Sequence, residues 1–150
     1  MAVYQVVTYP DPVLREKAKE ITKITPSINR LIENMADTMY ASGGIGLAAP
    51  QIGVSKRAVV VDLGDGLMVL INPEITKAEG RERGKEGCLS FPDMWGEVDR
   101  ALSVKVRAFN LKGEEIFISA EGFLARALQH EIDHLDGIVF IDRAVKIEKD

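Results

Sequence analysis

The chain has 150 residues and a formal net charge of −4, from 19 Lys and Arg against 23 Asp and Glu. This length fits a single domain spanning residues 1–150, and the interspersed charges argue against direct nucleic-acid binding or an anionic membrane partner. No apolar run approaches the length of a membrane-spanning helix, and the opening residues lack a signal-peptide pattern, so we expect a cytoplasmic protein. Cys88 is the only cysteine and would act as a ligand or a nucleophile rather than in an internal disulfide.

The first third of the chain predicts two helices. Residues 11–21, DPVLREKAKEI, have the pattern of a brief helix entered through Pro12. A second helix begins at Thr25, which can act as its N-cap, with Pro26 at the first helical position. Apolar residues then recur at helical spacing until Ser42, Gly43 and Gly44 end the pattern: Ile28, Leu31, Ile32, Met35 and Met39.

The segment 43–53, GGIGLAAPQIG, is rich in glycine but has no lysine where a phosphate loop requires one, which excludes that motif. A flexible connection between helix and sheet is one interpretation. The glycines would also allow a ligand to approach the backbone closely, and the Gln51 amide offers two donors that could face a developing oxyanion. Both interpretations stay open from the segment's own residues.

The middle of the chain changes to strand patterns. Residues 57–63 and 67–73 are short apolar runs on either side of a glycine-rich turn, which predicts a hairpin. Residues 101–110 and 114–122 alternate apolar and polar side chains around a second turn. Strands followed by one late helix predict an α+β fold rather than a repeating βαβ pattern.

That late helix begins near Gly122 and ends near Gly137. One side of it combines apolar residues with both histidines of the chain and a glutamate: Phe123, Leu124, Ala127, Leu128, His130, Glu131, His134 and Leu135. The opposite arc collects polar residues: Arg126, Gln129 and Asp133. Because a buried glutamate is costly unless it is paired or neutralised, the apolar side should hold something that compensates for it.

The pattern H-E-x-x-H at 130–134 predicts a metal site, because histidines four apart on a helix can reach one ion while the glutamate reaches a water bound to it. The extended motif with a third histidine is excluded, since that position is Phe140. Glu148 lies in a charged tail and is a poor candidate. Cys88 is therefore the best third ligand, because a thiolate suits a borderline cation.

Three stretches resemble, in order, the three motifs of the peptide deformylase (polypeptide deformylase) family: GIGLAAPQ at 44–51, EGCLS at 86–90 and QHEIDH at 129–134. YPDPVLR at 9–15 is also similar to that family's N-terminal stretch, and the resemblance extends from about Tyr9 to Asp142. It implies an α+β fold in which antiparallel sheets pack around a central helix that carries the H-E-x-x-H motif. It also implies a metal-dependent hydrolase that removes the N-formyl group from the N-terminal formylmethionine of nascent polypeptides and releases formate.

The resemblance further implies roles for individual residues. Cys88, His130 and His134 would bind one ion per chain, with water as the fourth ligand; the family prefers Fe2+, and Zn2+, Ni2+ or Co2+ can substitute. Glu131 would be the general base and then the acid that protonates the leaving amine. The Gln51 side-chain amide and the Leu89 backbone N–H would hold the formyl oxygen. Backbone groups of four residues would line the peptide-binding cleft: Gly44, Ile45, Gly46 and Gly87.

The family's partners are N-formylmethionyl nascent peptides, and we expect a monomer. Many bacterial members continue into a long C-terminal helix linked to docking on the ribosome, whereas only RAVKIEKD follows Asp142 in this sequence. Ribosome contact through such a helix is therefore not expected here.

Two other hypotheses follow from the residues without the resemblance. The H-E-x-x-H motif by itself also fits a metallopeptidase that cleaves internal peptide bonds. A non-catalytic metal-binding module would instead close a four-ligand site, for which Asp133 or Asp136 could supply the carboxylate.

Overall fold

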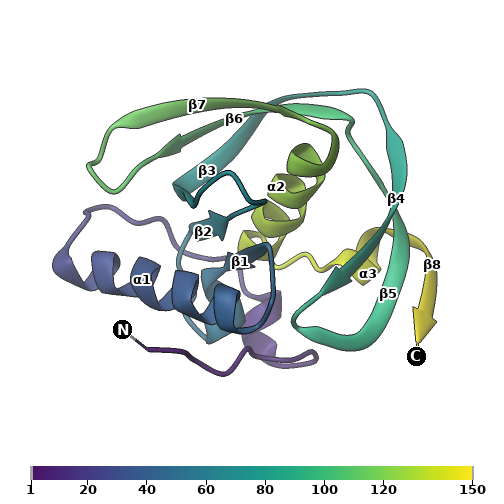
Figure 1. Ribbon diagram of the computed structural model, residues 1–150, viewed down its shortest axis with the longest axis horizontal. Helices are drawn as coiled ribbons and strands as arrows, with labels where there is room; N and C mark the ends of the chain where they lie inside the picture. The colour runs from purple at the N-terminus through teal and green to yellow at the C-terminus, as the bar shows by residue number, and fades with distance from the viewer. Residues whose placement is uncertain (1, 150) are drawn as a thin grey trace.

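The computed structural model describes residues 2–149 and has the predicted α+β fold (Figure 1). Within residues 2–149, two 3-10 turns and three helices accompany eight strands. In chain order they are η1 (Pro12–Arg15), α1 (Pro26–Ala41), β1 (Gly46–Ala48), η2 (Ala49–Ile52), β2 (Ala58–Val61), β3 (Met68–Glu79), β4 (Glu82–Cys88), β5 (Phe91–Arg100), β6 (Ser103–Phe109), β7 (Glu115–Glu121), α2 (Gly122–Leu135), α3 (Phe140–Arg143) and β8 (Ala144–Lys149).

The strands form two antiparallel sheets around α2. The larger sheet has the order β1-β2-β3-β6-β7, and the smaller has the order β4-β5-β8. Figure 1 shows α2 in the middle of the molecule, with the larger sheet on one side and the hairpin of β4 and β5 on the other. The helix that carries the H-E-x-x-H motif is therefore enclosed by both sheets, as the family resemblance implied.

The apolar run of β2 is buried on both faces because helices cover both sides of the larger sheet there. Val59 and Val61 belong to the apolar cluster that includes Leu128 of α2. Ala58 and Val60 belong to the cluster that includes α1. This alternation follows from the two-residue period of a strand, and burial on both faces explains why the segment reads as a continuous apolar run.

The helix predicted from Thr25 is present, and the helix predicted over residues 11–21 is wrong. The Thr25 side chain accepts a hydrogen bond from the Ile28 N–H at 3.4 Å, which is the expected N-cap. In the earlier segment only η1 is helical. The Ala18 N–H donates to Leu135 O at 2.8 Å instead of to its own segment, and Lys19 forms a bridge with Lys56. Tertiary hydrogen bonds thus replace the local helix.

Both predicted hairpins are confirmed, and a third was missed. β2 pairs with β3 around the first turn, and β6 pairs with β7 around the second. The missed hairpin joins β4 to β5, and β8 then pairs with β5. Residues after Arg143 up to Lys149 are therefore a strand. No helix among residues 2–149 is long and apolar enough to cross a membrane.

Candidate metal centre and cleft

Three candidate metal ligands converge from two elements. Cys88 ends β4, while His130 and His134 lie one turn apart on α2. One donor atom from each lies within 4.8 Å of the others, and Cys88 Sγ is 3.3 Å from His134 Nε2. Metal–ligand bonds of about 2.0–2.3 Å place neighbouring donors roughly 3–4 Å apart. One sulfur and two nitrogens therefore fit a single ion.

Unpaired polar atoms beside these donors point to the same conclusion. Glu131 is 6% exposed, and its Oε1 atom has no hydrogen-bond partner among residues 2–149. The Nδ1 atom of His134 is buried and without a partner in the same part of the chain. Because a buried unsatisfied polar atom costs about 1–3 kcal/mol, such atoms mark a place where a ligand or water belongs.

A buried carboxylate, that of Glu86, contacts the Nδ1 side of the His130 ring. His130 Nδ1 lies 2.9 Å from Glu86 Oε1, so a proton on Nδ1 is shared with Glu86 and Nε2 is left for a metal. Arg100 donates to both oxygens of Glu86, each at 2.9 Å, and Arg126 donates to Oε2 at 2.6 Å. The carboxylate is thus fixed by two guanidinium groups, and it fixes the imidazole in turn.

The polar arc of α2 is buried, whereas the sequence pattern placed it opposite the core. Arg126 is 6% exposed and also donates to the backbone oxygens of Glu82 and Val98. Gln129 forms hydrogen bonds with both backbone groups of Ala101. Asp133 accepts from Arg100 at 2.6 Å and from Arg143 at 2.6 Å. The second sheet supplies polar partners to this arc, which no helical periodicity can reveal.

Phe123 shows the opposite disagreement, because it is 60% exposed although the pattern placed it on the apolar side. It lies in the first turn of α2, at the mouth of the cavity that Cys88 also lines. The apolar stripe therefore extends beyond the packed part of the helix.

Burial and hydrogen bonds shift the pKa values of the ionisable groups in this site in different directions. In the absence of a bound cation, burial raises the pKa of Glu131 to about 7. Burial lowers the pKa of His134 well below its ordinary value, which favours the neutral imidazole that binds metals. Burial alone would raise the pKa of Glu86, but the hydrogen bonds from Arg100 and His130 outweigh it and lower that pKa far below its usual range.

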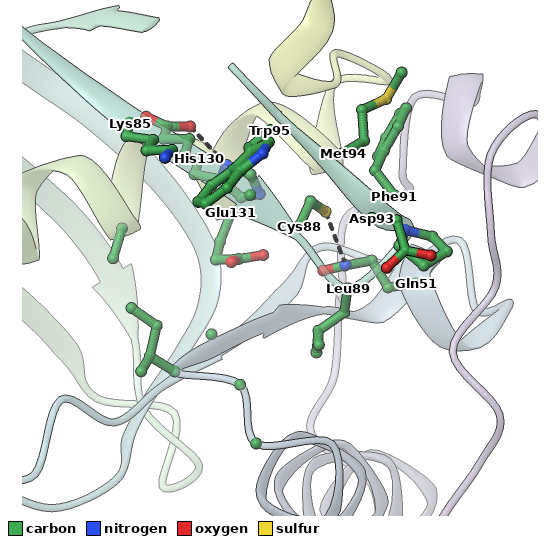
Figure 2. Close-up of a pocket in the computed structure, with 18 of the residues that line it drawn as sticks. Gln51, Lys85, Cys88, Leu89, Phe91, Asp93, Met94, Trp95, His130 and Glu131 are labelled. Carbon is green, nitrogen blue, oxygen red and sulfur yellow. Dashed lines mark hydrogen bonds and ion pairs between the residues drawn. The ribbon is translucent and has the colours of Figure 1, made fainter. Parts of the chain in front are cut away.

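Gln51 is 1% exposed and is oriented by its neighbours. Its Oε1 atom accepts from the Ala48 N–H at 2.9 Å, so its amide nitrogen must point the other way. That nitrogen lies 3.2 Å from Ser90 Oγ and 3.5 Å from Cys88 Sγ. Figure 2 marks the contact with Cys88 by a dashed line. The amide donor is therefore directed toward the candidate metal ligands, and Leu89 follows Cys88 in the turn between β4 and β5.

A cavity of about 560 Å³ opens beside these groups. β1 is an edge strand of the larger sheet and β4 is an edge strand of the smaller one, and both border this cavity. A Cβ at Gly46 would lie 2.7 Å from Glu131 Oε2, so this wall has no room for a side chain there. The four residues expected to line the peptide cleft all lie on the cavity wall: Gly44, Ile45, Gly46 and Gly87.

The sequence missed several other residues that line this cavity. They come from β4 and β5, the hairpin that was not predicted: Lys85, Phe91, Asp93, Met94 and Trp95. The only signal near them was the EGCLS stretch, which ends β4 and opens the turn.

The chain matches known proteins along almost its whole length. Residues 3–150 match the family model described as polypeptide deformylase. A peptide deformylase of Desulforudis audaxviator is 61% identical over 99% of this chain and 98% of its own length. A peptide deformylase of Carboxydothermus hydrogenoformans is 63% identical over 98% of this chain and 97% of its own length.

Solved structures agree with this assignment. The crystal structure of peptide deformylase from Thermotoga maritima superimposes with a TM-score of 0.93 at 45% identity, covering 95% of this chain and 97% of that one. A peptide deformylase from Synechococcus elongatus in complex with actinonin gives a TM-score of 0.91 at 42% identity, covering 94% and 78%. The family model, the close relatives and the shared fold together establish that this chain belongs to the polypeptide deformylase family.

Proposed function

We propose that this protein hydrolyses the formyl amide of N-formylmethionyl peptides, releasing formate and a free N-terminal methionine. The observation that carries the proposal is the cluster of donor atoms of Cys88, His130 and His134 beside a cavity that Glu131 also lines and that two free strand edges border. Family membership supports the same reaction.

Cys88, His130 and His134 hold one Fe2+ per chain in this proposal, and Zn2+, Ni2+ or Co2+ can replace it. The donor set of one thiolate and two imidazoles suits these cations and disfavours Mg2+ or Ca2+, which prefer oxygen ligands. When bound, such an ion acts as a Lewis acid toward the reacting groups.

Glu131 is the proton carrier. Its carboxylate accepts a proton from the attacking water and delivers it to the amine of methionine as the C–N bond breaks. Burial raises the pKa of this carboxyl to about 7 in the metal-free site, and a group that titrates near neutral pH suits a role in which it must both take and give a proton.

Gln51 and Leu89 stabilise the developing charge on the formyl oxygen. The Gln51 Nε2 donor is already directed toward Cys88 by the hydrogen bond between its Oε1 atom and Ala48. A donor that is held before the reaction costs no reorganisation when the charge develops. The Leu89 backbone N–H supplies the second donor.

The peptide lies as an added strand between the edges of β1 and β4. An extended peptide can pair with a free strand edge through main-chain hydrogen bonds, which recognise any sequence. Backbone groups of Gly44, Ile45, Gly46 and Gly87 make these bonds. This mode fits an enzyme that must accept many different nascent chains after the common formylmethionine.

The remaining proposals concern the setting of the reaction. Residues 1–150 act as one catalytic domain, as a monomer, in the cytoplasm and on nascent peptides. Because β8 occupies the chain from Ala144 to Lys149, these residues do not form a docking helix, and any ribosome contact made by residues 2–149 uses another surface.

The test is formate release from a formyl-Met-Ala-Gln amide by protein loaded with Fe2+ under anaerobic conditions. Glu131→Gln serves as the variant, because it should keep the metal and the fold but lose about 10²–10⁴-fold in turnover. Equal turnover in both proteins would remove the role of Glu131. Internal fragments of longer peptides in mass spectra would indicate the metallopeptidase instead, and no reaction by metal-loaded protein would favour the non-catalytic module.

A further inference from the structure

One wall of the cavity carries a lysine that forms no ion pair with any of residues 2–149. Lys85 lies on β4 and is exposed, and its Nζ atom is 3.1 Å from the centre of the Trp95 ring on β5. Both side chains line the cavity that contains Glu131 and Cys88. Figure 2 shows the lysine and the indole side by side on the wall that also carries Cys88.

The strand register explains why these two side chains meet. Trp95 lies directly opposite Gly87, and Lys85 lies opposite Glu97, so Lys85 and Trp95 are diagonal neighbours on one face of the hairpin. Gly87 has no side chain, which leaves that face open between them. Attraction between the ammonium and the indole ring restrains an otherwise flexible lysine.

The hydrogen-bonding capacity of Lys85 is unused within residues 2–149. An ammonium has three donors, and none of them forms a hydrogen bond or ion pair with a described residue. The neighbouring Lys146 is paired with Glu148 at 3.3 Å. Asp93, an exposed carboxylate of the same cavity, is drawn on the far side of Cys88 from Lys85 in Figure 2. Glu97 and Glu148 also lie near Lys85, but Glu148 is paired with Lys146 and neither carboxylate forms an ion pair with Lys85. The Lys85 ammonium is therefore the positive group that this wall offers to a ligand in the cavity.

The position of Lys85 along β4 defines which part of a peptide it can reach. A strand rises about 3.3 Å per residue, so Lys85 lies roughly 10 Å along β4 from Cys88. A peptide whose formyl group is at Cys88 and whose chain follows the edge of β4 would bring its third residue abreast of Lys85, with formylmethionine counted as the first.

We propose that Lys85, restrained by Trp95, makes this enzyme prefer formylated peptides with an acidic third residue. The inference rests on the proposed function, because it concerns the same cleft and the same reaction. The recognised group is a side-chain carboxylate, and the interaction is a partly exposed ion pair, so the preference should be modest and sensitive to salt.

The experiment compares kcat/KM for three amidated peptides, formyl-Met-Ala-X with X as Glu, Gln or Lys, at low ionic strength. The amide removes the terminal carboxylate, so only X carries charge. Wild type should favour Glu over Gln about three-fold and disfavour Lys, and both ratios should fall toward one in 0.5 M salt. Lys85→Gln should abolish the preference, and Lys85→Glu should reverse it.

Lys112→Gln is the matched control, because it removes an exposed lysine in the turn between β6 and β7 that lies apart from Lys85 and from the cavity lining, and it should leave the Glu to Gln ratio of wild type unchanged. Equal kcat/KM for all three peptides in wild type, or an unaltered ratio in Lys85→Glu, would overturn the inference while the deformylase activity stands. No formate from the Gln peptide in wild type would instead count against the proposed function.

Discussion

The two sides of α2 are buried by different means. Toward the larger sheet, Leu128, Ile132 and Leu135 join an apolar cluster with side chains of β2, β3 and β6. Toward the smaller sheet, Arg126 and Asp133 join a cluster of charges with Glu86, Arg100 and Arg143. Apolar packing is not directional, so it holds the helix in place without fixing any single atom. Hydrogen-bonded ion pairs are directional, so they fix the orientation of His130 and the strand that bears Cys88.

The charged side of α2 is better explained by its effect on the orientation of His130 than by a gain in folding stability. Removing ions from water costs several kcal/mol each, and buried pairs often only offset that cost. Here each carboxylate is fully engaged: Glu86 by Arg100, Arg126 and His130, and Asp133 by two arginines. A Cβ at Gly84 would lie 2.8 Å from the Arg126 guanidinium carbon, so the strand leaves room for this charge.

Breaking the charged side should have the largest effect. Glu86→Gln leaves the buried guanidinium group of Arg126 without a counter-charge and leaves Arg100 with Asp133 alone, which should destabilise the protein by about 3–5 kcal/mol. It also replaces the charged acceptor behind His130 with a neutral amide, which should weaken metal binding by about 10–100-fold. Urea unfolding and metal titration below the unfolding transition measure the two effects.

A surface ion pair provides the control for this variant. Arg83 pairs with Asp99 at 2.8 Å, and its side chain is 57% exposed, so Arg83→Gln should change stability by less than about 1 kcal/mol and leave metal binding unchanged. If Glu86→Gln bound the metal as tightly as wild type, the charged side would have no part in positioning His130.

A substitution on the apolar side of α2 should lower the free energy of unfolding but leave the metal affinity unchanged. Leu128 is fully buried, and Leu128→Ala should cost about 2–5 kcal/mol of unfolding free energy through lost burial and the cavity left behind. The folded fraction should keep the metal affinity of wild type, as measured by titration at low temperature. A loss of affinity comparable to that of Glu86→Gln would mean that the two sides of α2 do not act separately.

A pH series on metal-free protein sharpens the comparison at Glu131, which lies between the two sides. Burial raises its folded pKa to about 7 from an ordinary value of 4.5, so the folded state holds the proton more tightly than the unfolded state does. The folded state then loses stability as pH rises from about 4.5 to about 7, by about 3 kcal/mol in total, and no more above that range.

Glu131→Gln removes this titration, so the difference in unfolding free energy between the metal-free variant and wild type should grow in favour of the variant across that window. Taking the difference cancels the other titrating groups. A difference that stayed constant from pH 4.5 to 7.5 would show that Glu131 is not desolvated in the metal-free protein.

The smallest effect is expected for Phe123, a residue of α2 that packs neither in the apolar cluster nor in the charged cluster. Phe123 is 60% exposed in the first turn, so Phe123→Gln should change the unfolding free energy by less than about 0.5 kcal/mol. Thermal unfolding would measure it. A larger loss would place this ring in the packed part of the molecule.

The apolar side of α2 could be predicted from the sequence, and the charged side could not. The spacing of Leu124, Leu128 and Leu135 in one chain segment is enough to predict a face that packs against a sheet. The partners of Arg126 come from β4 and β5, which are 28 to 44 residues away in the chain. Because long polar side chains in a helix are usually solvated, the pattern favoured an exposed arc.

The sequence predicted which residues would bind the metal, but it did not predict the hairpin that forms one wall of the site. The H-E-x-x-H motif and the single cysteine indicated three metal ligands, and the structure brings their donor atoms together. The hairpin of β4 and β5 was missed because its strands contain glycines and charges instead of an alternating apolar pattern: ERGKEGC and FPDMWGEVDR. Two glycines of this hairpin allow other groups to approach the backbone closely: Arg126 approaches Gly84, and the backbone of Lys146 approaches Gly96.

The placement of the free strand edges also bears on how this protein avoids aggregation. An unpaired edge can template pairing with another chain, so folded proteins hide or blunt such edges. The edges of β1 and β4 border the cavity, so we expect them to be less accessible to the sheet of a second folded copy than an edge on the outer surface is. The outer edge of the smaller sheet is β8, whose charged residues Lys146, Glu148 and Lys149 discourage pairing. Two of the four sheet edges therefore lie at the cavity, where the proposed peptide would pair with them, whereas β7 and β8 form the outer edges of the two sheets.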